Sequence, residues 1–126
     1  MSALPDDAMR AEAARTWPLE RRANKRLPAR GSVVIEVRKG TMGLGLNLAL
    51  HLLDLSTDGA GVLMKGELQE NDEVEILLSG SGIRTTMKRI ARVRWVTKLE
   101  SGHFIMGMSF EKQLPFSDVT SFIRPG

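Results

Sequence analysis

Residues 46–65 read Leu-Asn-Leu-Ala-Leu-His-Leu-Leu-Asp-Leu-Ser-Thr-Asp-Gly-Ala-Gly-Val-Leu-Met-Lys, and this stretch decides the fold. Residues 54–59 combine aspartate, serine and glycine, which favour tight turns. Residues 61–65 are a short apolar segment of the kind found in buried strands. Before the turn, every second residue is a leucine, a period typical of β-strands: Leu46, Leu48, Leu50 and Leu52. The stretch therefore predicts two strands joined by a turn.

Further strands are predicted on both sides of this stretch. They are rich in branched apolar residues, are separated by glycine-containing turns, and cover residues 32–39, 73–79, 84–96 and 103–110. Closing six antiparallel strands into a small barrel removes the exposed edges of the sheet. After Pro115, the apolar residues follow helical spacing at Phe116, Val119, Phe122 and Ile123. We expect a mainly β fold, a six-stranded antiparallel barrel with a short C-terminal helix.

The chain has 126 residues, which fits one domain. We expect residues 1–16 to be a flexible tail or a short helix, and residues 17–126 to form the barrel domain, with its helix at about 115–124. The absence of cysteine excludes disulfides and thiolate metal sites. The N-terminus lacks the basic and apolar regions of a secretory signal, and no apolar stretch approaches the ~20 residues of a membrane helix. A cytoplasmic protein without membrane insertion is predicted.

Charge is unevenly distributed along the chain. Several arginines and lysines, and no acidic residue, occur in each of the segments 21–30 and 84–98. In residues 67–75, by contrast, all charged residues are acidic. Clustered basic residues indicate an anionic partner, although solvated faces of strands and loops have the same composition. No nucleophile–base pair or metal-ligand cluster is visible, so no enzyme, metal or cofactor is predicted.

Two arginines in the first basic segment, Arg22 and Arg26, have the spacing Arg-x-x-x-Arg. Guanidinium groups stay charged and grip phosphate oxygens, or guanine O6 and N7, in a bidentate manner. Pro28 disfavours a helical Leu27, so we expect an extended or irregular hook. The spacing also arises by chance in an arginine-rich chain, and a solvated basic linker is the alternative.

The turn Asp54-x-Ser56-x-x-Gly59 is a more specific pattern. Aspartate and serine side chains bond nearby backbone amides, and glycine supplies positive φ, so a plain structural turn is one interpretation. In the other, the carboxylate accepts hydrogen bonds from guanine N1–H and N2–H₂ while the hydroxyl bonds beside it.

The predicted topology brings these two segments together. The residues between Arg26 and Asp54 fit two strands and a turn, and the entry and exit of an antiparallel hairpin lie at the same end. Cationic donors would then face a carboxylate and a hydroxyl at one rim of the barrel. That combination suits a guanine nucleotide with exposed phosphodiesters.

In these segments the sequence resembles the PilZ family. Glu20-Arg21-Arg22-Ala23-Asn24-Lys25-Arg26 matches the family's Arg-x-x-x-Arg motif, and residues 54–59 match its Asp/Asn-x-Ser-x-x-Gly motif. Residues 91–96, Ala-Arg-Val-Arg-Trp-Val, and 107–110, Gly-Met-Ser-Phe, resemble its last two strands. The resemblance covers about residues 19–124.

The resemblance implies a cyclic di-GMP receptor in bacterial second-messenger signalling. Arg22 and Arg26 would grip phosphate and the Hoogsteen edge of guanine, Asp54 and Ser56 would read a guanine, and Gly59 would allow close backbone approach. Arg21, just before the first motif arginine, could hold a second ligand molecule. We expect binding to order residues 17–29, and a downstream protein partner to read that change.

Two alternatives remain at this point. One is a PilZ-like protein-interaction subunit that does not bind nucleotide. The other is a nucleic-acid binder using the basic run 84–98, but such barrels present surface aromatics for stacking and this chain has few. Trp95 could stack on a guanine, yet an aromatic residue in an alternating strand is expected in the core.

Overall fold

The computed structural model describes residues 27–80 and 86–123, so the tail 1–16 and both arginines of the hook, Arg22 and Arg26, lie outside the described residues. The described part contains seven strands and one helix. They are β1 (Leu27–Pro28), β2 (Val33–Lys39), β3 (Ala49–Leu55), β4 (Gly59–Met64), β5 (Glu73–Gly80), β6 (Met87–Lys98), β7 (Phe104–Phe110) and α2 (Phe116–Phe122).

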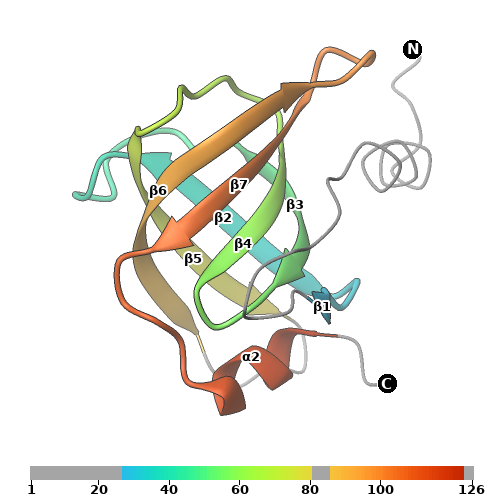
Figure 1. Ribbon diagram of the computed structural model, residues 1–126, viewed down its shortest axis with the longest axis vertical. Coiled ribbons are helices and arrows are strands. Elements are labelled where there is room, and N and C mark those ends of the chain that lie inside the picture. Colours follow the sequence, from blue (N-terminus) through green and yellow to red (C-terminus); the bar gives the residue numbers. More distant parts are fainter. Residues whose placement is uncertain (1–26, 81–85, 124–126) are drawn as a thin grey trace.

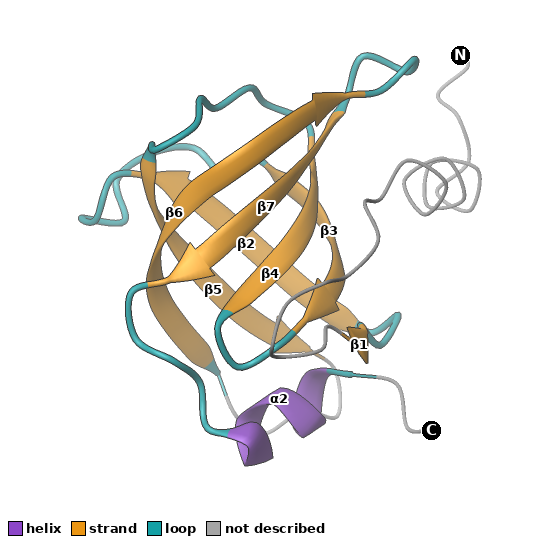
Figure 2. Cartoon of the chain, viewed as in Figure 1, coloured by secondary structure: helices purple, strands orange, loops and turns teal. Residues whose placement is uncertain are grey.

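The strands form one antiparallel sheet in the order β1-β3-β4-β7-β6-β5-β2. The sheet curls until β2 approaches β3, where Leu48 N donates to Val37 O at 2.8 Å. Figures 1 and 2 show the resulting nearly closed barrel, with α2 at one end. The six-stranded antiparallel barrel with a C-terminal helix is thus confirmed, and the two-residue β1 is an addition that the sequence did not predict.

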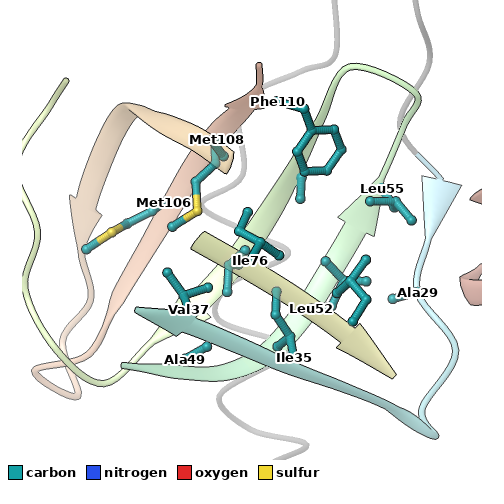
Figure 3. Close-up of a cluster of buried hydrophobic side chains, with 14 of the residues drawn as sticks. Ala29, Ile35, Val37, Ala49, Leu52, Leu55, Ile76, Met106, Met108 and Phe110 are labelled. Carbon is teal, nitrogen blue, oxygen red and sulfur yellow. The ribbon is translucent and has the colours of Figure 1, made fainter. Parts of the chain in front are cut away.

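The barrel interior holds the main hydrophobic core. Along β2 and β5 the buried positions alternate as expected, and Ile35, Val37 and Ile76 point into the interior together with side chains of β3 and β7 (Figure 3). Val119 and Phe122 of α2 are buried and belong to the same cluster. The inward-facing residues of the strands and the apolar face of the helix therefore belong to one core.

The predicted alternation in β3 is wrong. Leu46 is 82% exposed and precedes the strand, whereas the inward residues are Ala49, Leu52 and Leu55. The pairing of β3 with β4 shifts register twice, between Ala49 and His51 and between Leu52 and Asp54. Each β-bulge inserts one residue into the strand, so the side-chain period of two becomes a local spacing of three.

A second apolar cluster lies on the outer face of the barrel. Buried Leu63, Leu99 and Ile105 form its centre, and Leu50, Leu53 and Trp95 pack against it. This cluster explains why Leu63 of β4 is buried although it faces away from the interior. Trp95, which we expected in the core, is half-buried and packs against this outer cluster.

The end of α2 is tied to the chain that follows β1. Arg30 N donates to Phe122 O at 2.9 Å, Arg30 Nε donates to Ile123 O at 3.0 Å, and Ala29 forms a bridge with Ile123. The closing helix and the entry segment thus stabilise each other. Among the described residues, no helix is both long and apolar enough to cross a membrane.

Candidate ligand-binding site

The turn between β3 and β4 is held by its own hydrogen bonds. Ser56 N donates to Gly59 O at 2.9 Å, and the Ser56 hydroxyl donates to Asp58 Oδ1 at 2.6 Å. Ser56 is only 2% exposed. The Ser56 side chain therefore stabilises the turn from within. Gly59 does not adopt the positive φ expected for it.

The C-terminal segment braces this turn from outside. Phe110 N donates to Asp58 O at 2.9 Å, and Leu114 N donates to Thr57 O at 2.8 Å. The turn is consequently attached to the end of β7 and to the approach to α2. Its shape does not depend on the β3–β4 connection alone.

Asp54 lies on the outer face of the sheet, where β3 ends. Its side chain is half-buried, and its Cα partners are Gly61 on β4 and Pro28 on β1. Gly61 lies between Ala60 and Val62, which both belong to the interior cluster, so residue 61 and its partner face outward.

Arg21, Arg22 and Arg26 lie outside the described residues, but the chain directly after them is placed. Leu27 is paired with Leu55, and Pro28 with Asp54. The reason for this proximity differs from the predicted hairpin, because the ladder partner of β2 is β5 and not β3. The two-residue strand β1 is what brings the entry segment to the Asp54 turn.

A strip without side chains crosses the outer face beside Asp54. Gly61 on β4 is the partner of Gly107 on β7, and Gly107 is the partner of Trp95 on β6. Figure 1 shows these strands side by side. A Cβ atom on Gly107 would lie 2.2 Å from Trp95 Nε1, so the indole lies directly on the glycine backbone. Sequence reasoning did not assign a site role to Gly61 or Gly107, because a glycine in a strand shows its importance only through its neighbours across the sheet.

Comparison with protein-family models matches residues 20–124 to the PilZ domain. The chain belongs to the PilZ family. Comparison with curated proteins found no similar sequence. PilZ domains are binding and adaptor domains, and the family is known for binding cyclic di-GMP. The match includes the Arg-x-x-x-Arg segment, the Asp54 turn and the Gly107–Trp95 contact.

The basic strand of the PilZ barrel is not simply a solvated face. Arg92 donates to Asn71 O at 3.0 Å and lies 3.8 Å from a carboxylate oxygen of Glu73. Arg94 donates through Nε to the Ser109 hydroxyl at 2.6 Å. Part of the positive charge on β6 is therefore held in defined positions over β5 and β7.

Replacing Gly107 by alanine is expected to destabilise the PilZ barrel by about 1–3 kcal/mol, because the new methyl group would displace the Trp95 ring from β7. Urea unfolding measures the loss. In a Trp17→Phe background, the tryptophan emission should also shift to the red, because Trp95 would become more exposed.

Gly31→Ala is the matched control, since no atom lies within 4 Å of the position of its added Cβ. Its stability should change by less than about 0.5 kcal/mol. Equal stability of the two variants would show that Trp95 does not need the bare backbone at Gly107.

Proposed function

We propose that this PilZ protein is a cyclic di-GMP receptor whose binding site lies at the barrel rim between the arginine hook and the Asp54 turn. The observation that carries the proposal is the pairing of β1 with the end of β3. Through this pairing, the residue that follows Arg26 in the sequence lies opposite Leu55, next to Asp54. The chain that directly follows the arginine motif is thus paired with the strand that ends in the Asp54 turn, which supports a shared site at this rim.

The chemistry of each residue suits one part of this ligand. The Asp54 carboxylate can accept hydrogen bonds from guanine N1–H and N2–H₂. Arg22 and Arg26 can bind phosphodiester oxygens or the O6/N7 edge of guanine. Ser56, already engaged within the turn, would keep the turn in the shape that presents Asp54 and would contact guanine from there. Gly59 carries no side chain to obstruct the ligand.

The signal would pass through the chain before β1. We expected residues 17–29 to become ordered on binding, but Leu27–Pro28 already pairs with β3, and buried Ala29 donates from its N–H to Leu53 O at 3.1 Å. The proposed ligand-induced change is therefore limited to residues before 27. A downstream protein in the cytoplasm would read the new position of that segment, and the barrel itself would carry out no catalysis.

Under this proposal, Arg21 determines how many molecules of cyclic di-GMP each chain binds. Arg21 adds a third guanidinium beside the motif pair and would hold a second, stacked molecule of cyclic di-GMP. Two molecules per chain are then expected in a titration of the wild type, and a stoichiometry of one would contradict this role of Arg21.

Thermal unfolding with cyclic di-GMP and with GMP tests the proposed function. A ligand that binds only the folded state stabilises it by about 2.7 kcal/mol at 100 times its dissociation constant. Cyclic di-GMP should therefore raise the melting temperature, whereas GMP at the same concentration, with the same base but no second half, should have little effect. Unchanged melting with both ligands would oppose the proposal.

A protein-interaction subunit that binds no nucleotide is the second candidate. One observation favours contacts with a protein, namely the exposed apolar side chains in the loop between β2 and β3. Met42, Leu44 and Leu46 are 77%, 85% and 82% exposed. Exposed apolar side chains gathered in one loop are a feature of protein-interaction sites. This loop lies at the opposite end of β3 from Asp54, so the two functions are not mutually exclusive.

A further inference from the structure

Arg94 occupies a β-bulge in β6, which is separated from β4 and the Asp54 turn by the single strand β7. Val93 is paired with Met108 and Trp95 with Gly107, so β6 advances two residues while β7 advances one. Arg94 is the additional residue. Bulges redirect side chains and are frequent beside functional sites. Here the bulge places two consecutive side chains on the outer face, where Arg94 contacts Ser109 and Trp95 covers Gly107.

The contact with Ser109 brings Arg94 close to the Asp54–Gly59 turn. Ser109 is the Cα partner of Gly59, the last residue of the motif. Adjacent strands lie about 4.8 Å apart, so the Arg94 guanidinium, bonded to Ser109 Oγ at 2.6 Å, is about one strand away from Gly59. Phe110 N donates a hydrogen bond to Asp58 O, and this contact holds the end of β7 beside the turn.

A shallow pocket opens where Arg94 and Ser109 meet. Its volume is about 250 Å³, and it is lined by Glu73, Ile90, Ala91, Arg92, Arg94, Ser109, Phe110 and Glu111. Arg92 is occupied by Glu73 and by Asn71 O. Arg94 differs, because within the described part of the chain it has no carboxylate at ion-pair distance and uses only Nε, for Ser109. The terminal nitrogens of its fork remain for a ligand.

We propose that Arg94 is a ligand-contacting residue that binds a phosphodiester of cyclic di-GMP while the Asp54 turn holds a guanine. This inference rests on the proposed function and adds a cation from β6 to the arginines of the N-terminal hook. The ligand carries two negative phosphodiesters and would approach a turn that already contains Asp54 and Asp58. A guanidinium held on β7, the strand next to β4, offsets part of that repulsion, and its planar fork matches two phosphate oxygens.

Calorimetric titration of cyclic di-GMP into four proteins tests this role: the wild type, Arg94→Ala, Arg94→Lys and Lys98→Ala. Arg94→Ala removes a hydrogen bond to a charged phosphate group. It should therefore weaken the binding of cyclic di-GMP roughly 10- to 150-fold. Arg94→Lys should recover part of this loss, because it keeps the charge but not the fork. Lys98, exposed at the end of the same strand, is the control with an equal change in charge. Its replacement should change the affinity by less than about threefold.

The outcomes separate this inference from the function on which it rests. If the wild type releases no binding heat, the proposed function fails. If the wild type binds, Asp54→Ala binds poorly and Arg94→Ala binds like the wild type, then only the role of Arg94 is refuted. Equal losses in Arg94→Ala and Lys98→Ala would also refute a specific contact, because they would indicate general electrostatic attraction. Arg94 is exposed, so the melting temperature of its variants should match that of the wild type.

Discussion

Phe122→Ala is expected to lower the free energy of unfolding by about 3–5 kcal/mol. Phe122 is the last residue of α2, and its side chain is completely buried against the interior of the barrel. Its removal leaves a cavity that the surrounding strands can fill only in part. Small domains have a total stability of about 5–15 kcal/mol, so this single change would remove a large share of it. Urea unfolding followed by far-UV circular dichroism measures the difference.

The same helix provides the control. Phe116 is the first residue of α2 and is 63% exposed. Phe116→Ala should change the stability by less than about 0.5 kcal/mol, although it deletes the same atoms. A similar loss in both variants would mean that α2 does not close the barrel as described.

Asp54→Ala is expected to weaken the binding of cyclic di-GMP by at least about 30-fold. Truncating one partner of a buried, hydrogen-bonded charged contact costs about 2–5 kcal/mol, and each 1.4 kcal/mol is a factor of ten. Asp54→Asn should lose less, because the amide keeps one acceptor oxygen. Equilibrium dialysis with labelled ligand measures both affinities.

Glu70→Ala removes the same charge from the exposed loop that follows β4, at the other end of that strand. Its affinity should equal that of the wild type within about threefold. Because Asp54 is on the outer face, its variants should remain folded, and their melting temperatures check this. Wild-type affinity in Asp54→Ala would move the ligand away from this turn.

The architecture could be predicted because its strongest signals are local. In β2 and β5, alternating apolar residues show directly which face is buried, and the helical spacing of Val119 and Phe122 identifies the closing helix. The turn at residues 54–59 could be located from its aspartate, serine and glycine. These features depend on few neighbours, so a single sequence reveals them.

The remaining features depend on partners that are distant in the sequence. The bulges in β3 and β6 shift the pairing without any distinctive residue, so alternation places Leu50 on the wrong face and hides the common face of Arg94 and Trp95. Two residues are too few for β1 to show a period, yet its pairing with β3 is what brings the chain after Arg26 to the Asp54 turn. The missing side chain of Gly107 becomes meaningful only once Trp95 is known to lie across it.

The most direct test of the central claim is calorimetric titration of cyclic di-GMP into the wild-type chain. We predict a saturable heat of binding that persists in Glu70→Ala and is lost or strongly reduced in Asp54→Ala. The absence of binding heat in the wild type at high micromolar ligand would contradict the proposed receptor function, and it would favour the interaction subunit that binds no nucleotide.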